Sequence, residues 1–275
     1  MPVRLLHLSD IHFGAENRGA VAAAVDFARD APFDLMIVSG DITQAGSLAE
    51  FAIAAAWLAA FPGPHLCTPG NHDTPWMGLI DRLVRPFDDY GRSIGPHAVG
   101  DFSMDGVSVR NVNTARGWQL RLNWSKGEIS RPQTRRLIEA FDGDPPGDVR
   151  VLVCHHPLVE AVGEPMTARV RGGAAAAKRL TKAGVDVVLS GHTHAPFCQS
   201  YPFGDRLTHA VGAGTLSTRE RGVPASFNVI DIEANEMNVQ VMAWTDGRFA
   251  AAQQWVSPLR PRAPLAVHRN ADGVW

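Results

Sequence analysis

Five short apolar runs in this chain are each followed directly by side chains that can bind a metal or move a proton. This repetition restricts the fold more than any other feature of the sequence. The third run ends at Cys67 and leads into a sharp turn that carries Asn71, His72 and Asp73. The other four clusters are Asp10-Ile11-His12, Gly40-Asp41, His155-His156 and Gly191-His192-Thr193-His194. Because strand carboxyl ends in an α/β sheet point toward one crevice, we expect all five clusters to meet there.

The first part of the chain alternates buried-strand patterns with helix patterns. Residues 3–9, 35–38 and 65–67 are predicted strands. Helical spacing over residues 17–29, and a capping box that opens a second helix at Ser47, predict the two connections. This order predicts a parallel sheet with right-handed crossovers.

The rest of the chain departs from this alternation. Residues 76–95 are predicted to form a small helical cap over the strand ends, and Asp105-Gly106 predicts a hairpin turn. Further predicted elements are helices over 130–141 and 173–183, strands over 149–154 and 185–189, and an antiparallel meander over 210–211, 227–232, 237–244 and 249–255. We expect one α/β domain over residues 1–256 and a Pro- and Arg-rich tail over 257–275.

Composition narrows the function classes. The 275 residues are 45% hydrophobic and 20% charged, which suits one large domain with a sizeable core. A formal net charge of -2 provides no basic field that would attract duplex nucleic acid. Cys67, Cys154 and Cys198 form no CxxC motif, so we expect reduced thiols in a cytoplasmic protein. No apolar stretch is long enough to predict a signal peptide or a membrane span.

The clusters supply carboxylates, imidazoles and one amide but no thiolate, which favours Mn, Fe or Zn. The candidate ligands are Asp10, His12, Asp41, Asn71, His155, His192 and His194. Seven ligands exceed the need of one four-coordinate ion and fit two ions about 3.5–4 Å apart, an arrangement that can clamp a phosphoryl group. A carboxylate is needed between two such ions, and Asp41 is the best candidate because it follows the middle strand of the first three.

The motifs Asp-x-His, Gly-Asp, Gly-Asn-His-Asp, a His before Pro after a late strand, and Gly-His-x-His together resemble the calcineurin-like metallophosphoesterase superfamily over residues 3–196. Within it, the Gly-Asn-His-Asp form and the final Gly-His-x-His look like the class III cyclic nucleotide phosphodiesterases and related bacterial phosphodiesterases. The resemblance implies a four-layer αββα sandwich, in which two mixed β-sheets are flanked by helices.

The resemblance also assigns roles to the candidate residues. It implies one ion held by Asp10, His12 and His194, a second held by Asn71, His155 and His192, and Asp41 bridging them. His72 matches a family histidine that is not a ligand and faces the substrate phosphate. The implied chemistry is in-line attack by a metal-bound hydroxide, with His72 donating to the phosphoryl oxygen or the leaving group.

These roles predict a binuclear metal-dependent hydrolase of a small-molecule phosphodiester, and a cyclic nucleotide such as 3′,5′-cAMP is the first candidate by resemblance. A pyrophosphatase or lipid-headgroup phosphodiesterase is the alternative, although its cap would be expected to carry a longer apolar groove than residues 76–95 offer. The absence of a basic stripe argues against a metal-dependent nuclease. A metal-free scaffold on a degenerate fold would have lost ligands, and here every ligand position is filled. Family members often dimerise, so a homodimer is a further expectation.

Other side chains carry weaker signals. Arg116 is a tentative phosphate clamp, although an exposed loop arginine is the commoner explanation. His156 should point away from its neighbouring ligand, as a supporting residue or a substrate contact. Asp73 is expected to brace its turn or to orient a ligand histidine. The aromatic residues that could frame a pocket for a planar group, or pack within the cap, are Trp76, Trp118 and Trp124.

Overall fold

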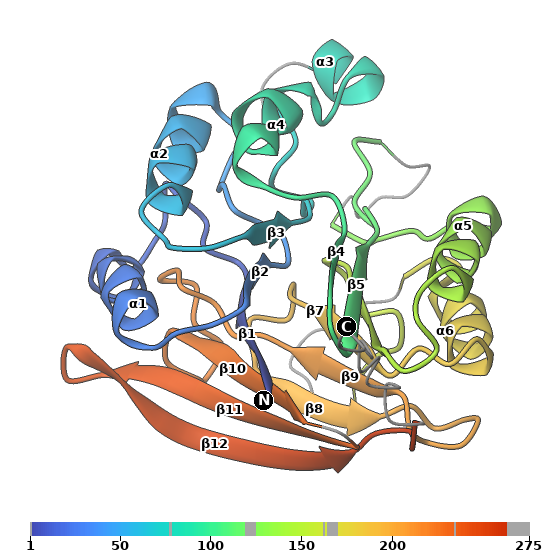
Figure 1. The fold of residues 1–275 in the computed structure, drawn as a ribbon. Helices are drawn as coiled ribbons and strands as arrows, with labels where there is room; N and C mark the ends of the chain where they lie inside the picture. Colours follow the sequence, from blue (N-terminus) through green and yellow to red (C-terminus); the bar gives the residue numbers. More distant parts are fainter. Residues whose placement is uncertain are drawn as a thin grey trace, which may run out of the picture.

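Two six-stranded β-sheets form the centre of the computed structural model (Figure 1). The structure describes residues 2–76, 79–118, 125–161, 163, 170–233 and 235–262. Among these residues, no helix has both the length and the apolar character that crossing a membrane requires.

The first sheet is built on three parallel strands, which are β1 (Val3–Leu8), β2 (Leu35–Val38) and β3 (His65–Cys67). They are connected by the helices α1 (Arg18–Asp30) and α2 (Leu48–Leu58). The capping box predicted at Ser47 is present, with Ser47 and Glu50 each accepting a backbone N–H of the other. The predicted parallel start of the chain is therefore confirmed.

Three antiparallel strands extend this sheet beyond β1. They are β10 (Ser226–Glu233), β11 (Glu236–Thr245) and β12 (Arg248–Pro258). The strand order is β12-β11-β10-β1-β2-β3, so β2 is the middle one of the three parallel strands.

The second sheet has the order β4-β5-β6-β7-β9-β8. Its strands are β4 (Phe102–Met104), β5 (Val107–Asn111), β6 (Val149–Val153), β7 (Val187–Ser190), β8 (Phe197–Ser200) and β9 (His209–Gly212). Its two helices are α5 (Arg131–Asp142) and α6 (Gly173–Lys182). The strands β5, β6, β7 and β9 are parallel to one another, and β4 and β8 run antiparallel at the two edges.

The prediction that Ala210-Val211 belongs to the antiparallel meander is wrong. These residues lie in β9, which pairs in parallel with β7 in the second sheet and antiparallel with β8, a strand that was not predicted. All four residues of β9 are buried. A strand buried on both faces shows no polar alternation, so its sequence pattern does not reveal which strand it pairs with.

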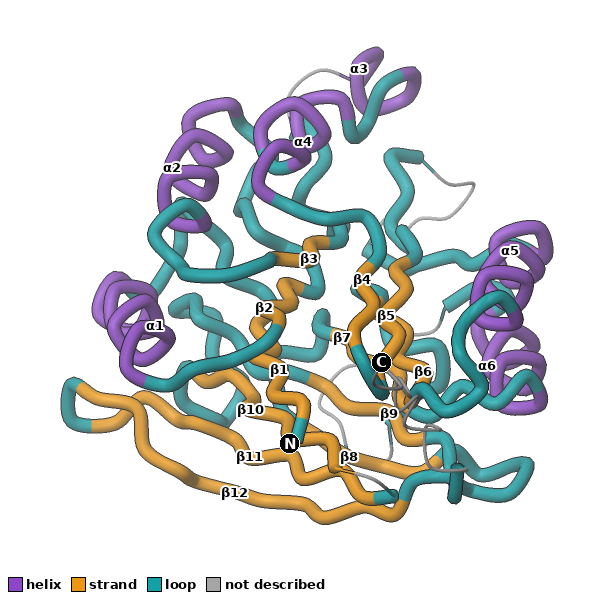
Figure 2. Tube along the Cα trace, viewed as in Figure 1, coloured by secondary structure: helices purple, strands orange, loops and turns teal. Residues whose placement is uncertain are grey.

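Three layers of apolar contact hold the four structural layers together. Helices α1 and α2 pack on the outer face of the first sheet, where Leu6 and Leu8 of β1 point. Leu5 of the same strand points into the cluster between the two sheets, as the alternation of a strand requires. Helices α5 and α6 cover the second sheet on the opposite side (Figure 2). The predicted αββα sandwich of two mixed sheets is confirmed.

The predicted cap segment contains two short helices, α3 (Leu79–Val84) and α4 (Asp88–Ser93), followed by the 3₁₀ turn η1 (Gly95–His97). Helix α4 lies beside α2 (Figure 1). Ile94 is buried, and Tyr90 packs against the same apolar cluster as α2. Ile80 and Leu83 of α3 are exposed, so only the α4 half of the cap is anchored by apolar burial.

The last described residues continue the fold beyond residue 257, where a tail was predicted to begin. Leu259 is buried between the two sheets. The Arg260 guanidinium lies 3.0 Å from Asp186 and 2.8 Å from Asp205, and Arg262 also pairs with Asp186. Residues 263–275 of the predicted tail lie outside the described residues.

Candidate metal centre

The five ligand clusters follow β1, β2, β3, β6 and β7, and the structure brings them together where the carboxyl ends of the two sheets meet. In each of four groups, the potential ligand atoms lie within 4.8 Å of one another, and the groups share members. They are Asp10–His12–His194, Asp10–Asp41–His155, His12–Asp41–His72 and His155–His156–His192. The expectation that the clusters form a single site therefore matches the geometry.

The backbone at these positions is held in an unusual conformation. Seven non-glycine residues of the described chain have positive φ, and five of them are candidate ligands, namely Asp10, His12, Asp41, His192 and His194. Such left-handed conformations are uncommon outside glycine and persist only where the surroundings hold them. Here the N–H of Asp10 donates to the Gly40 carbonyl, and the N–H of His12 donates to the Asp41 carbonyl, each at 3.0 Å.

Glycines allow the loops to approach one another. A Cβ on Gly40, which has a φ of +98°, would lie 2.5 Å from Nδ1 of His155. A Cβ on Gly191 would lie 2.5 Å from the Asp10 carboxylate. Real Cβ atoms do not come this close to other heavy atoms, so a side chain at either position would push a candidate ligand out of place.

The first half of the centre is formed by Asp10, His12 and His194. The two Nε2 atoms of the histidines lie 3.2 Å apart. Oδ1 of Asp10 lies 3.2 Å from Nε2 of His194 and 3.7 Å from Nε2 of His12. All three side chains are buried and turn one ligand atom toward the same point.

The predicted second set is Asn71, His155 and His192, of which the structure brings His155 and His192 together, with Asp41 between His155 and His12. Oδ2 of Asp41 lies 3.3 Å from Nε2 of His155 and 3.9 Å from Nε2 of His12. The rings of His155 and His192 are 5.2 Å apart at their centroids. Asp41 is therefore the carboxylate that faces both sets of candidate ligands.

Three buried atoms show that these residues fit a metal centre. Oδ1 of Asp10, Oδ1 of Asn71 and Nε2 of His155 make no well-aligned hydrogen bond among the residues that the structure describes, although Nε2 of His194 lies close to the first and Oδ2 of Asp41 close to the third. Leaving a buried polar atom unpaired costs about 1–3 kcal/mol, so three of them in one site call for an explanation. A set of oxygen and nitrogen donors without sulfur suits Mn, Fe or Zn, which would satisfy all three.

Backbone carbonyls set the orientation of the histidine rings. Nδ1 of His155 lies 2.8 Å from the carbonyl of Ser39, and Nδ1 of His194 lies 2.9 Å from that of Arg219. A carbonyl can only accept, so each Nδ1 carries the proton. In the neutral ring the lone pair is then on Nε2, the atom that faces the centre.

The electrostatics of the metal-free site are dominated by Asp41. Burial disfavours its charged form, but His155, His72 and His12 hold the pKa of this carboxyl well below its usual range. Burial likewise opposes the charged His155 ring, yet Asp41 raises the pKa of that ring to about 9. Burial lowers the pKa of His192 to about 3. The metal-free site thus keeps Asp41 ionised beside a protonated His155, and that ring would have to release its proton when a metal binds.

His72 lies at the open side of the centre and is half-buried. Its backbone N–H donates to Oδ1 of Asp41 at 2.8 Å, and its ring packs edge-on against His12 with centroids 4.7 Å apart. Nδ1 lies 2.7 Å from the carbonyl of Gln44, so Nε2 is the atom left for another contact. That contact is Nη1 of Arg219, at 3.2 Å, a residue that the sequence interpretation did not select.

Asp73 braces the turn, which is one of its two predicted roles. Its carboxylate accepts from the N–H of Gly70 at 2.9 Å and of Thr43 at 2.8 Å. It also accepts from the Thr43 hydroxyl at 2.9 Å. These bonds tie the turn after β3 to the segment after β2.

His156 and Arg116 contact the protein itself. Both ring nitrogens of His156 are engaged, Nδ1 with the Thr114 hydroxyl at 3.0 Å and Nε2 with the Ser125 carbonyl at 2.8 Å. The Arg116 guanidinium donates to Oε1 of Gln133, in the capping box of α5, at 2.8 Å. These contacts favour supporting roles over the substrate roles that were tentatively predicted for both residues.

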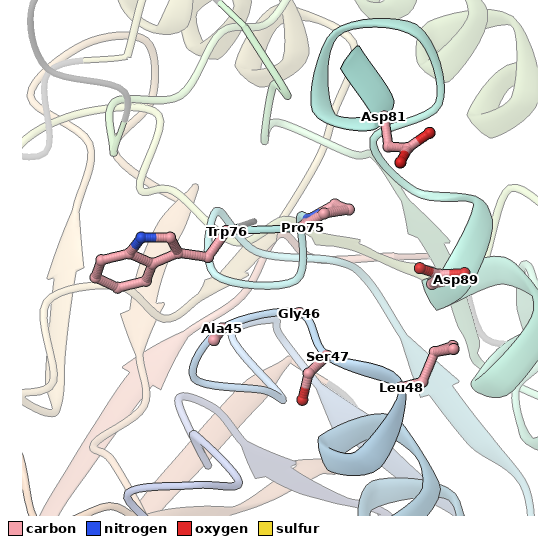
Figure 3. Close-up of a pocket in the computed structure, with 8 residues that line it drawn as sticks. All are labelled: Ala45, Gly46, Ser47, Leu48, Pro75, Trp76, Asp81 and Asp89. Atoms are coloured by element: carbon pink, nitrogen blue, oxygen red, sulfur yellow. The ribbon is translucent and has the colours of Figure 1, made fainter. Parts of the chain in front are cut away.

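A pocket of about 510 Å³ opens between the start of α2 and the cap, beside the turn that carries His72. Its lining includes Ala45, which follows Gln44, and Pro75. In Figure 3 the Trp76 ring lies away from the two carboxylates on the cap side, Asp81 and Asp89. Trp118 is exposed, and Trp124 lies outside the described residues. Trp76 is exposed as well, so burial in the cap accounts for neither of these two described tryptophans.

Sequence comparisons agree with this geometry. Residues 3–196 match the calcineurin-like phosphoesterase family. The chain is 26% identical over 176 residues to the 3′,5′-cyclic adenosine monophosphate phosphodiesterase CpdA of Escherichia coli (strain K12), a match that covers 57% of this chain and 56% of that one. It is 23% identical over 267 residues to a Synechococcus protein named "Probable cyclic nucleotide phosphodiesterase", which covers 90% of this chain and 94% of the relative. This chain thus spans little more than half the length of CpdA.

The fold is also found in a solved structure. A dimetal phosphatase from Danio rerio superposes with a TM-score of 0.69 at 12% identity, over 94% of this chain and 100% of that one. At this identity the likeness concerns the fold alone. The family match covers most of the chain and every ligand cluster. The chain therefore belongs to the calcineurin-like phosphoesterase family.

Proposed function

We propose that this chain is a binuclear metal-dependent phosphodiesterase. One ion would be held by Asp10, His12 and His194 and the other by Asn71, His155 and His192, with Asp41 between them. The observation that carries this proposal is the overlapping set of buried Asp and His ligand atoms that lie within 4.8 Å of one another around Asp10, Asp41 and His155. Membership of a family of metal-dependent phosphoesterases supports it.

When bound, the ions would lower the pKa of the attacking water and offset charge on the phosphoryl oxygens. The chain's own residues do the rest of the positioning. Asp41 accepts the backbone N–H of His72 and so fixes that turn against the centre. The Gln44 carbonyl orients the His72 ring so that Nε2 faces the open side, where it can contact a phosphoryl or leaving-group oxygen.

The substrate that we propose is a small phosphodiester, with 3′,5′-cyclic nucleotides the first class to test. The names of the CpdA and Synechococcus relatives support this choice. A second support is electrostatic. Apart from the two proposed ions, the cation that contacts His72 is one guanidinium, that of Arg219, rather than the cluster of basic side chains that a dianionic monoester would favour. We also propose a cytoplasmic location, with which three free cysteines agree.

A hydrolysis panel on metal-reconstituted protein tests the proposal. It should compare 3′,5′- and 2′,3′-cyclic nucleotides, glycerophosphodiesters, bis-aryl phosphodiesters and aryl monoesters, each with the Asp41→Asn variant as a blank. We expect kcat/KM to be higher for diesters than for monoesters, and activity to vanish with a chelator. A higher kcat/KM for monoesters would reassign the chain as a phosphatase. Full activity without bound metal would refute the proposal altogether.

A further inference from the structure

Arg219 belongs to the segment between β9 and β10, and its backbone is fixed by the metal centre. Its carbonyl accepts from Nδ1 of His194 at 2.9 Å, and its N–H donates to the Ser217 hydroxyl at 3.2 Å. The same segment reaches β1, because the Thr215 hydroxyl donates to the Asp10 carbonyl at 2.6 Å. The position of Arg219 is therefore coupled to two candidate ligands, one after β1 and one after β7.

The side chain of Arg219 turns toward the open side of the centre. Its Nη1 lies 3.2 Å from Nε2 of His72 and 3.4 Å from Oε1 of Gln44. Because Nδ1–H of His72 donates to the Gln44 carbonyl, Nε2 of the neutral ring accepts from Nη1 of Arg219. One guanidinium and one imidazole nitrogen thus face the same opening.

The charge of this guanidinium is not neutralised by the protein. Within the described ranges, no carboxylate lies within ion-pair distance of Arg219, although the residue is half-buried. Other arginines in similar surroundings are paired: Arg4 lies 2.7 Å from Asp231, and Arg260 lies 3.0 Å from Asp186. A partly desolvated cation without a counter-ion is costly, and an anion that binds beside it recovers that cost.

We infer that Arg219 forms an anion subsite that binds a non-bridging oxygen of the substrate phosphoryl group, next to Nε2 of His72. In the free protein Nη1 of Arg219 contacts Nε2 of His72. When substrate binds, the same N–H donates a charge-assisted hydrogen bond to a phosphoryl oxygen instead. The planar guanidinium offers a second N–H to the same phosphoryl group. This inference rests on the proposed function, because it places the phosphoryl group at the metal centre.

Inorganic phosphate is the probe that tests the subsite without turnover. Its affinity is measured by isothermal titration calorimetry on metal-loaded wild type and on Arg219→Gln, Arg219→Lys and Arg221→Gln. Arg221 is the matched control, because it stands two residues further along the same segment and is exposed. We expect Arg219→Gln to weaken phosphate binding about 10- to 100-fold and Arg219→Lys to recover part of the loss. Arg221→Gln should stay within about twofold of wild type, as expected for an exposed charge.

Metal content is measured on every variant, because Arg219 contacts His194 only through its backbone carbonyl. All variants should keep the metal content of wild type. Wild-type phosphate affinity in Arg219→Gln would overturn the inference, and so would loss of metal from that variant, since it would make Arg219 a support for the centre. A wild-type protein that hydrolyses no phosphodiester refutes the proposed function instead, and phosphate titration still reports on Arg219 in that case.

Discussion

The Nε2 atoms of His12 and His194 lie 3.2 Å apart, although 182 residues separate the two histidines in the chain. Two imidazoles that share one ion, with metal–nitrogen bonds of about 2.0–2.1 Å, place their nitrogens about 3 Å apart. The fold therefore holds this pair at the separation of ligands to one ion. Several consequences can be measured.

His12→Ala should lose metal and activity together, because it removes a ligand atom from the first half of the centre. His72→Ala should keep both metals and lose about 10²–10⁴-fold in turnover, since the ring is proposed to contact the phosphoryl or leaving-group oxygen. The loss should be smaller for nitrophenyl esters, whose leaving group needs little protonation. Elemental analysis and turnover on good and poor leaving groups measure both effects.

The two variants serve as controls for each other, because the ring centroids of His12 and His72 are only 4.7 Å apart. If His72→Ala lost a metal as His12→Ala does, His72 would be a ligand. Near-normal turnover of His72→Ala on poor leaving groups would remove it from the reaction.

Asp41→Asn should weaken both metals together. Oδ2 of Asp41 faces His155 on one side and His12 on the other, so one substitution removes negative charge from both halves. We expect each metal Kd to rise by more than the roughly 10- to 100-fold that loss of an outer supporting group costs. Asp231→Asn is the control, because that carboxylate pairs with Arg4 at the other end of β1. Full occupancy of either ion in Asp41→Asn would assign the bridge to another residue.

His156→Ala should lower the free energy of unfolding by about 2–4 kcal/mol while leaving KM within about twofold of wild type. The ring is buried, and its removal takes away the contact of Nδ1 with the Thr114 hydroxyl and that of Nε2 with the Ser125 carbonyl. Urea unfolding and KM are measured in parallel, with Thr114→Val as the variant that removes both bonds of the Thr114 hydroxyl to His156 and leaves the contact with the Ser125 carbonyl. A raised KM at unchanged stability would show that His156 touches the substrate.

Arg116→Ala should cost about 1 kcal/mol of stability and leave KM unchanged, because the guanidinium donates to Gln133 in the cap of α5. Arg135→Ala on the exposed face of the same helix is the control, since its ion pair with Glu139 is largely solvated. A tenfold rise in KM for Arg116→Ala would restore the phosphate-clamp hypothesis.

Chelated protein should lose stability as pH rises from 6.5 toward 9. Burial opposes the charged ring of His155, but Asp41 outweighs it and raises the pKa from 6.5 to about 9. A group whose pKa is raised in the folded state stabilises the fold fully at pH values below its unfolded-state pKa. At pH values above its folded-state pKa it no longer does so. The lowered pKa values of His7 and His192, both about 3, act only below 6.5, whereas burial of His194 is outweighed by Asp10, which raises the pKa of His194 and acts in the same direction as for His155.

The expected loss across this window is on the order of 1–3 kcal/mol. Urea unfolding of the chelated protein at several pH values measures it. His155→Asn, which keeps a donor for the Ser39 carbonyl, should flatten the dependence. A wild-type stability that is constant from pH 6.5 to 9 would contradict the pairing of His155 with Asp41.

The sequence by itself determined the parallel start of the fold and the set of candidate ligands. Each ligand cluster directly follows an apolar run, and strand ends leave little freedom in where the next residue lies. The order β1, β2, β3 then follows from the connecting helices, and it places Asp41 after the middle strand. Local patterns were sufficient to predict these features because each candidate ligand lies directly after its strand in the sequence.

Only the tertiary structure decided the features that depend on contacts between distant segments. Arg219 contacts His72, which lies 147 positions away in the sequence. Arg116 contacts Gln133 in the cap of α5 rather than the candidate metal centre. The pairing of β9 with β7 is of the same kind. Backbone carbonyls orient His155 and His194, and a carbonyl is present at every residue, so no sequence pattern marks the ones that do this. The sequence could therefore name the candidate ligands, whereas the groups that orient them, and the guanidinium beside His72, emerge only when the two sheets pack together.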